Sequence, residues 1–464
     1  MKAMIFDRTV MRLASLSLIA ALGVVLPVTA ARAADLAIGG ERLVKLLDKG
    51  IPAGERSVEA IIPWRDRTIV ITSGDRCHVL VFDAASSETR EIASIPGPAT
   101  VGAAALEGDD ILWVGTRLSD AQFHALARSR GIQVDIRDIR ALPLDGRFDT
   151  GRLYRISGVS GAKAEVRDLG TPVPNQGINS LACDAKRGKL YGFTWPLGRF
   201  FIRDIASGTT ETVSYGEQEI VEHAYVTTLY QPKLPGNEKN IAGVHRYPSE
   251  VTKYRPFEVL TGRKPIAEAL WVDPEGGVYT SGFLGMLIRW DPARAAFDTL
   301  AQLPAAPGRN GYNCVTALLP GGDGLLYGGD WEGYLFAWDA AKRRMLSFGK
   351  PFRAKGITGL AFSPKGDVLY GAGGGKDEGY GRLFAFDPSE RTFILEIPRR
   401  EGSFLYGYEG TEISLLSDTG VGAFAGDARG NLVVGQTGRV ANLLVLYESR
   451  LPRVKETVAP YQEK

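Results

Sequence analysis

A short block that ends in an aromatic residue and an aspartate recurs along this chain at a constant interval. It reads GMLIRWD at 285–291, GYLFAWD at 333–339 and GRLFAFD at 381–387, so successive copies are 48 residues apart. Weaker copies bring the total to seven and end at Asp83, Ser157, Asp204 and Tyr447. A fixed period of about 40–50 residues with short strands and glycine turns is typical of a β-propeller. The repeat therefore predicts an all-β, seven-bladed propeller with four-stranded antiparallel blades.

The clearest repeat, residues 357–397, shows how four strands fit into one blade. Apolar runs of four to seven residues alternate with turns rich in Gly, Pro, Asp and Ser, which is the pattern of successive hairpins. We name the strands A to D in chain order, with A innermost. Alignment to this repeat predicts the other blades at 57–96, 100–170, 177–216, 266–304, 313–350 and 418–448.

The last blade shows only strands A, B and C clearly. Residues 41–48, ERLVKLLD, are predicted to supply its fourth strand, and a segment at 450–458 is the alternative. Pairing the start of the chain with the last blade would close the ring and remove an exposed strand edge. A single propeller domain is therefore expected over residues 35–456.

The N-terminal segment has the features of an export signal. A basic leader that ends at Arg12 precedes an apolar stretch at 13–31, and Ala31-Arg32-Ala33 matches a cleavage site. These features predict a signal peptide over residues 1–33 and a periplasmic or secreted protein; an uncleaved anchor is the alternative. No later run of 18 apolar residues exists, so no membrane insertion of the mature protein is expected.

The charge balance restricts the partners. The whole chain carries 55 Lys and Arg against 53 Asp and Glu, a net charge of +2. The leader holds Lys2, Arg8, Arg12 and Arg32 against Asp7, which is +3, so the mature chain is 2 − 3 = −1. A near-neutral chain argues against nucleic acid or an anionic membrane as partner. A monomer is expected.

The cysteines do not form a disulfide framework, because there are only three of them: Cys77, Cys183 and Cys314. The latter two fall in predicted innermost strands, where cysteine behaves as a small apolar residue. Cys77, beside His78, is the one candidate for a reactive thiol.

Departures from the period locate two insertions. The next copies end 74 residues after Asp83 and 87 residues after Asp204, which places insertions at about 117–149 and 217–264. The first insertion is predicted to begin with a short helix capped by Ser119. Because blade strands alternate in direction, B–C loops and D-to-A links must share one face. Both insertions belong to that face.

The same face collects the side chains that are candidates for binding, since loops on a rigid scaffold usually carry function. All four histidines are predicted to lie there: His78, His124, His223 and His245. The predicted binding residues are Trp195 and Trp331 in B–C loops, Asn175, Tyr312 and Asn313 in links, and His78. Packing or surface histidines are the alternative. Trp290 and Trp338 recur with the repeat and are predicted to pack between blades, and the repeated Asp is predicted to accept hydrogen bonds in the C–D turn.

Residues 190–204, LYGFTWPLGRFFIRD, resemble blades of exported bacterial seven-bladed propellers. That group includes the propeller-fold polysaccharide lyases, some of which carry two histidines about twenty residues apart with a downstream Tyr and Arg. His223 and His245 are 22 residues apart, and Arg246 and Tyr247 follow at once, a spacing that departs from the lyase pattern. The resemblance implies β-elimination at a uronic acid.

In that reading His223 or His245 is the base, Arg246 holds the carboxylate, and Tyr247 or Tyr225 is the acid. Trp195 and Trp331 would stack on sugar rings. A divalent metal is a candidate cofactor whose identity the sequence leaves open.

Other functions remain open, because the chain has no GxSxG, HExxH, CxxC or EF-hand motif. The main alternative is a non-catalytic propeller that binds a glycan or a protein. A glycoside hydrolase and a metal-dependent lactonase are further alternatives on the same scaffold.

Overall fold

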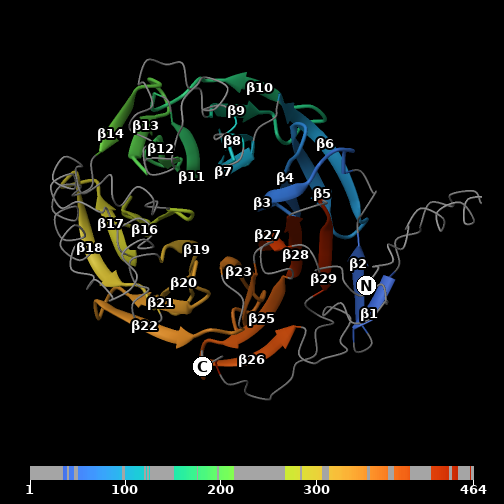
Figure 1. The fold of residues 1–464 in the computed structure, drawn as a ribbon, viewed down its shortest axis with the longest axis vertical. Coiled ribbons are helices and arrows are strands. Elements are labelled where there is room, and N and C mark those ends of the chain that lie inside the picture. The colour runs from blue at the N-terminus through green and yellow to red at the C-terminus, as the bar shows by residue number, and fades with distance from the viewer. Residues whose placement is uncertain are drawn as a thin grey trace, which may run out of the picture. The chain divides into compact units, whose positions relative to one another are not determined.

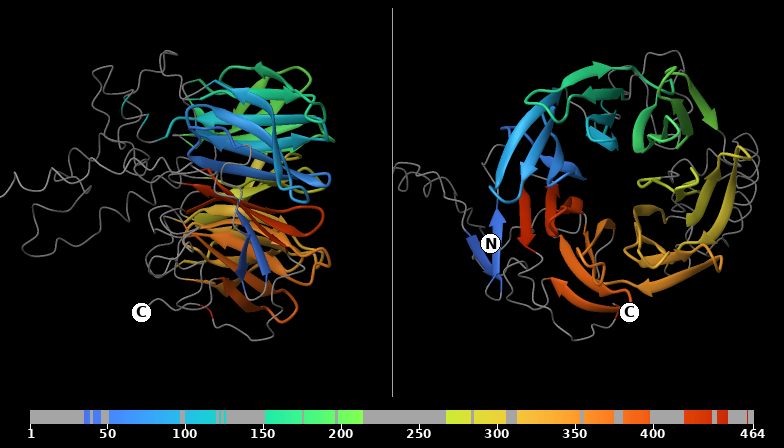
Figure 2. Two further views of the ribbon diagram at one scale, coloured as in Figure 1. Left: turned by 90° about the vertical axis from the view of Figure 1, so that its right-hand side faces the viewer. Right: turned by 180° about the vertical axis from the view of Figure 1, so that it is seen from behind.

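The computed structural model describes most of the chain after residue 34. The described residues are 35–38, 41–45, 51–96, 100–119, 122, 125, 151–174, 176–195, 198–213, 267–282, 285–305, 313–352, 356–374, 381–397, 420–437, 441–447 and 460. Within residues 35–464, the strands form successive sheets arranged around a central axis (Figure 1). Figure 2 shows the same sheets edge-on and from behind.

Five blades are separate four-stranded antiparallel sheets. Blade two comprises β7 (Thr100–Glu107), β8 (Ile111–Arg117), β9 (Leu153–Ser157) and β10 (Glu165–Asp168). Blade three comprises β11 (Gly177–Asp184), β12 (Lys189–Trp195), β13 (Phe200–Asp204) and β14 (Thr210–Val213). Blade four comprises β15 (Trp271–Val272), β16 (Val278–Ser281), β17 (Met286–Asp291) and β18 (Ala296–Gln302). Blade five comprises β19 (Val315–Pro320), β20 (Leu326–Asp330), β21 (Leu335–Asp339) and β22 (Arg344–Gly349). Blade six comprises β23 (Ile357–Phe362), β24 (Leu369–Gly373), β25 (Arg382–Asp387) and β26 (Thr392–Ile397).

The first and last blades share one nine-stranded sheet. Blade one comprises β3 (Ser57–Trp64), β4 (Arg67–Ser73), β5 (Cys77–Asp83) and β6 (Glu88–Ile95). Blade seven comprises β27 (Gly420–Gly426), β28 (Asn431–Thr437), β29 (Leu443–Tyr447) and, from the N-terminal side, β2 (Glu41–Lys45). β1 (Asp35–Ile38) pairs with the outer edge of β2. A single residue pair, Thr437 and Ser57, joins the two blades. The protein is thus a seven-bladed β-propeller.

The ring closes as the sequence predicts. β2 pairs antiparallel with β29, with Leu43 opposite Leu446 and Lys45 opposite Leu444. The N-terminal strand therefore supplies the fourth strand of the last blade, which confirms the prediction over residues 41–45; residues 46–48 lie outside the described residues. The alternative strand at 450–458 lies outside the described residues.

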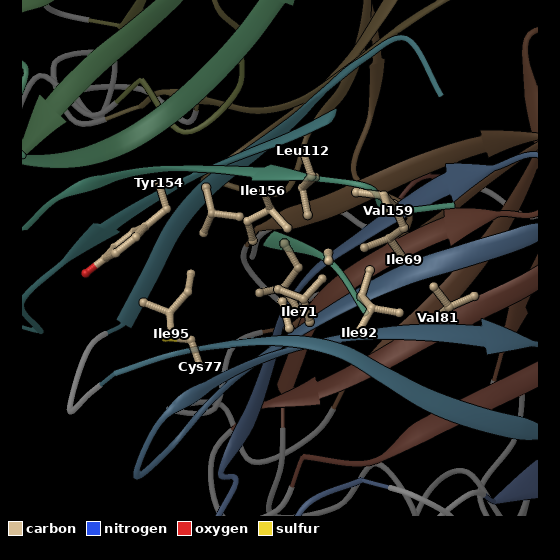
Figure 3. Close-up of a cluster of buried hydrophobic side chains, with 14 of the residues drawn as sticks. Ile69, Ile71, Cys77, Val81, Ile92, Ile95, Leu112, Tyr154, Ile156 and Val159 are labelled. Carbon is tan, nitrogen blue, oxygen red and sulfur yellow. The ribbon is translucent and has the colours of Figure 1, made fainter. Parts of the chain in front are cut away.

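Seven clusters of buried apolar side chains hold the blades together, one at each boundary between consecutive blades. Figure 3 shows the boundary between blades one and two, where Ile69, Ile71 and Val81 of blade one meet Leu112 and Ile156 of blade two. Burying one such side chain contributes about 1.5–3 kcal/mol. Because the clusters run around the ring without a break, each blade is stabilised by both neighbours.

The two-residue period of a strand sends alternate side chains to opposite neighbours. In β21, Phe336 and Trp338 pack against blade four, whereas Leu335 and Ala337 pack against blade six. Trp290 lies between blades three and four in the same way. These positions confirm that Trp290 and Trp338 are packing residues.

Strand A of six blades carries a β-bulge at the same position. In five of these blades the bulged residue lies against the next blade: Gly102, Asn179, Thr316, Thr358 and Gly422. The Thr316 hydroxyl donates to the Ile357 carbonyl across the boundary at 2.6 Å. At other blades glycine fills the position: a Cβ on Gly102 would lie 1.8 Å from the Ile178 oxygen, and one on Gly422 would lie 2.2 Å from the Val58 oxygen. Only glycine permits that backbone approach.

The repeated aspartate organises the C–D turn, as the sequence predicts. The side chains of Asp83, Asp204, Asp291, Asp339 and Asp387 all accept backbone N–H bonds from residues two or three further on. At Asp204, the hydrogen bonds from the Ser207 N–H and from the Lys189 ammonium lower the pKa of the carboxyl group to about 2. Four residues after each aspartate the backbone is left-handed, with positive φ at Ser87, Gly208, Ala295, Arg343 and Arg391.

Several predictions concern residues outside the described part of the chain. The signal segment 1–33 and the insertion at 217–264 lie wholly outside it, as does most of the insertion at 117–149. At the start of the latter, Ser119 Oγ accepts the Gln122 N–H at 3.2 Å, and Gln122 Oε1 accepts the Ser119 N–H at 2.8 Å. This reciprocal pair is the hydrogen bonding of a capping box. Most of the helix predicted to follow Ser119 lies outside the described residues. Among the described residues, no helix is long and apolar enough to cross a membrane.

Gly102→Ala should destabilise the propeller, because its methyl group would overlap the Ile178 carbonyl of the neighbouring blade. We expect a loss of about 3 kcal/mol in the free energy of unfolding, at the upper end for overpacking. Thermal unfolding of the variant measures it. Gly322→Ala is the matched control, since no atom lies within 4 Å of its added Cβ. Equal melting temperatures for the two variants would contradict the inter-blade contact.

The left-handed turn position should respond in opposite directions in two blades. Ala295→Gly relieves the Cβ clash of a φ of 48°, whereas Gly208→Ala introduces it at a φ of 73°. We expect shifts of about 0.5–1 kcal/mol, stabilising for the first variant and destabilising for the second. Denaturant midpoints measure both, and shifts of the same sign would argue against a shared turn geometry.

Candidate functional site

B–C loops and D-to-A links contact each other at one end of the blades, which we call the B–C face. The Trp331 N–H of a B–C loop donates to the Cys314 carbonyl of a link at 2.9 Å. In blade six the Gly374 N–H donates to the Gly356 carbonyl at 3.1 Å, and in blade one the Arg56 N–H donates to the Ser73 carbonyl at 2.8 Å. These bonds confirm the shared face that strand alternation predicts.

Trp331 is the most prominent feature of this face. It follows β20 directly and is 40% exposed, the only exposed large hydrophobic side chain among the described residues. The turn that carries it is tightly bonded: the Gly333 N–H donates to the Asp330 carbonyl at 3.0 Å, and the Tyr334 N–H donates to Asp330 Oδ1 at 2.8 Å. Gly333 has a φ of 92°, which suits glycine. The ring is therefore presented by a fixed backbone.

Asn313 fixes this turn and has no remaining hydrogen-bonding capacity. Its Nδ2 donates to the Pro304 carbonyl at 2.5 Å and to Asp330 Oδ2 at 2.8 Å. Its Oδ1 accepts the N–H groups of Cys314 at 3.0 Å and Glu332 at 3.2 Å. Both donors and both lone pairs of the amide are thus in use. Asn313 positions the turn, and the structure does not support the direct ligand contact predicted for it.

Asp330 is fully buried beneath the turn. Burial raises its pKa to about 7, although the bonds from Tyr334 and Asn313 oppose that shift, and the nearby Glu332 charge adds to it. Glu332 and Lys350 are also buried here, and the Lys350 ammonium lies 5.3 Å from the centre of the Tyr334 ring. Desolvation raises the pKa of the Cys314 thiol well above its usual range, so it is not a nucleophile at neutral pH.

His78 lies at the start of β5, the third strand of blade one, and its ring lies between two carboxylates. Its Nδ1 is 3.2 Å from Glu91 Oε2, and its Nε2 is 3.7 Å from Glu55 Oε1. The side chain is 13% exposed, so little of it is available to a ligand. Cys77 beside it is buried, which raises its pKa to about 12. The prediction of a reactive Cys77 thiol is therefore wrong.

Trp195 differs from its prediction. It ends β12 rather than lying in an open loop, and only 3% of it is exposed. The Arg117 guanidinium lies 5.8 Å from the centre of its ring. A buried ring with a cation against it does not offer a surface for stacking on a sugar.

The remaining candidates lie outside the described residues. They are the predicted catalytic residues His223, His245, Arg246 and Tyr247 and the predicted binding residues Asn175 and Tyr312. Their roles stay predictions. Where side chains are described, no group of three or more His, Cys, Asp or Glu side chains is arranged to hold a metal ion.

The sequence reasoning missed the buried charges under Trp331. Asp330, Glu332 and Lys350 look like ordinary loop residues in the sequence. Asp330 ends the apolar strand β20, but Asp291 ends the apolar strand β17 and is partly exposed, so this position in the sequence does not predict burial. Nothing in the sequence distinguishes Lys350 from an exposed lysine.

No family model matches this chain, and no curated protein is similar to it in sequence. Solved structures with the same fold include the extracellular domain of BT4673 from B. thetaiotaomicron, described as a hybrid two-component system. It has 12% identity and a TM-score of 0.50, and the match covers 86% of this chain but only 39% of that one. The WD40 repeats of RRP9 have 11% identity and a TM-score of 0.50, with 87% and 97% covered. At these identities the likeness shows the β-propeller fold alone.

Because burial raises the pKa of Asp330, the stability of the protein should fall as pH rises. Burial raises the folded-state pKa of Asp330 from its usual 3.8 to about 7, so the folded protein binds the proton more tightly than the unfolded chain. The stabilisation is complete below about pH 4 and is lost as pH rises to about 7. We expect Asp330→Asn to be more destabilising at pH 5 than at pH 8, measured as melting temperatures relative to wild type. A pH-independent difference would contradict the shift.

Proposed function

We propose that this protein is an exported, non-catalytic binding propeller that recognises a saccharide on its B–C face, with Trp331 as the central contact. The observation that carries the proposal is the exposed Trp331 ring on a turn fixed by Asn313 and Asp330. A rigidly held aromatic side chain loses little conformational entropy on binding, which is why tryptophan is common at binding hot spots.

The surroundings of Trp331 support binding rather than catalysis. The polar groups next to Trp331 are buried and hold the turn in place. The Asp330 carboxylate accepts two hydrogen bonds, and the Asn313 amide already uses all its donors and acceptors. A general base must reach its proton within hydrogen-bonding distance, and none of these groups is exposed for that purpose. The four residues proposed for β-elimination lie outside the described part of the chain, so nothing in the geometry favours a lyase.

Two further observations support the exported form of the proposal. Residues 1–33 have the composition of a signal peptide. One structure with the same fold is an extracellular domain. A binding domain needs only an exposed aromatic ring, here that of Trp331, on the B–C face.

Trp331→Ala should weaken glycan binding by about 30-fold, which corresponds to the loss of about 2 kcal/mol at a hot spot. The mature protein is screened on an array of uronic-acid and neutral polysaccharides, and the affinity of the variant for the best ligand is then measured by calorimetry. Lys365→Ala, an exposed change at an A–B turn on the opposite face, is the control and should bind as wild type.

Two outcomes would overturn the proposal. One is unchanged affinity of Trp331→Ala for the bound polysaccharide. The other is absorbance from unsaturated products on incubation with uronic-acid polysaccharides, which would identify a lyase.

A further inference from the structure

Two arginine side chains are directed to the boundary between blades two and three at the B–C face. Arg117 is the last residue of β8, and Arg199 lies directly before β13. Trp113 of β8 and Phe201 of β13 both belong to the apolar cluster at this boundary. Because alternate residues of a strand share a face, Arg117 and Arg199 point to the same boundary from its two sides. Both side chains are half-buried.

Arg117 is held in place by its neighbours on both blades. Its guanidinium lies 5.8 Å from the centre of the Trp195 ring of blade three, within the range of a cation–π contact. Its stem passes Gly102, where an added Cβ would lie 3.3 Å from Arg117 Cδ. A guanidinium that packs against an aromatic ring keeps its N–H donors in a rigid planar fork. The donors of Arg117 are therefore positioned without being used by Trp195.

The positive charge of these two arginines is not balanced by an acidic partner. Arg152, on the same face, forms an ion pair with Asp168 at 2.7 Å. In contrast, neither the Arg117 nor the Arg199 guanidinium pairs with a carboxylate in the part of the chain that the structure describes. Two like charges directed to one boundary repel each other, and an anion between them would be attracted by both.

This boundary opens on the face that carries Trp331. Arg117, Trp195 and Trp331 occupy equivalent positions in blades two, three and five. Each lies two residues beyond the strand B residue that pairs immediately after the β-bulge of strand A. The same position in the repeat thus supplies an exposed aromatic ring in blade five and a cation packed on an aromatic ring at blades two and three.

We propose that the saccharide recognised on the B–C face carries an acidic group, a carboxylate or a sulfate, and that Arg117 and Arg199 bind this group. The inference rests on the proposed function and names the class of its ligand. Oxyanions accept paired N–H bonds from a guanidinium, and such charge-assisted bonds are roughly twice as strong as neutral ones. A neutral sugar would leave both positive charges uncompensated.

Three polymers with one backbone test the proposal: dextran sulfate, carboxymethyl dextran and unmodified dextran. Calorimetric titration of the mature protein should show that at least one acidic polymer binds about tenfold more tightly than dextran, because dextran offers no charged acceptor. Arg117→Gln should remove most of that preference, and Arg199→Gln should reduce it. The tighter of the two acidic polymers identifies the group as sulfate or carboxylate. Equal affinity for all three polymers would overturn the proposal.

Arg167→Gln is the matched control. Arg167 is an exposed arginine on β10, the outermost strand of blade two, so the variant removes one positive charge away from the boundary. It should bind the acidic polymer as wild type. An equal loss of affinity in all three glutamine variants would indicate general attraction to a polyanion and would overturn the proposal. Melting temperatures establish that each variant is folded.

Trp331→Ala separates this inference from the proposed function. If that variant binds weakly while both boundary variants bind as wild type, the saccharide site stands and the anion site fails. The reverse result would leave the arginines as the anion contact and remove Trp331 from the site. Crystals of the mature protein soaked in sodium bromide give a readout without a saccharide: we expect an anomalous peak against the Arg117 guanidinium, and no peak there would overturn the proposal.

Discussion

Each blade of this protein is apolar on both faces, and that constraint decides the architecture. In β21 the side chains of Phe336 and Trp338 need blade four, while those of Leu335 and Ala337 need blade six. No blade can bury both faces with one neighbour, so the stable arrangement is a closed ring in which seven boundaries are filled. The strand that joins the first and last blades follows from the same need, since β2 covers the edge that blade seven would otherwise expose.

A closed ring provides a rigid frame on which short loops can be placed accurately. The B–C face uses it at blade five, where buried Asp330 and saturated Asn313 fix a turn and leave Trp331 exposed. The polar groups there already use their hydrogen-bonding capacity to hold the turn. A site built in this way can present an aromatic surface with little loss of entropy, which suits recognition better than proton transfer. The opposite end of the blades is organised differently, by aspartates such as Asp291 that bond their own turns.

The fold was predictable because its signals are local and repeated. The 48-residue period, the strand alternation and the closing strand at 41–45 are all confirmed, and so is the packing role of Trp290. The candidate site was less predictable. Trp331 was identified from its loop, but Trp195 has the same loop context and is buried against Arg117. Asn313 was expected to face a ligand, whereas it faces the protein. Loop position indicates which face a residue belongs to and does not indicate its exposure.

By itself the sequence determined the repeat, the number of blades, the strand order and the face shared by B–C loops and D-to-A links. Those properties depend on periodicity and chain direction, and both can be recognised from the residues of each repeat alone. Only the tertiary structure decided which polar groups are buried, saturated or left without a partner. Asp330 and Asp291 both end a strand, yet Asp330 is fully buried and Asp291 is partly exposed. That difference depends on distances between segments far apart in the chain, and no local pattern encodes them.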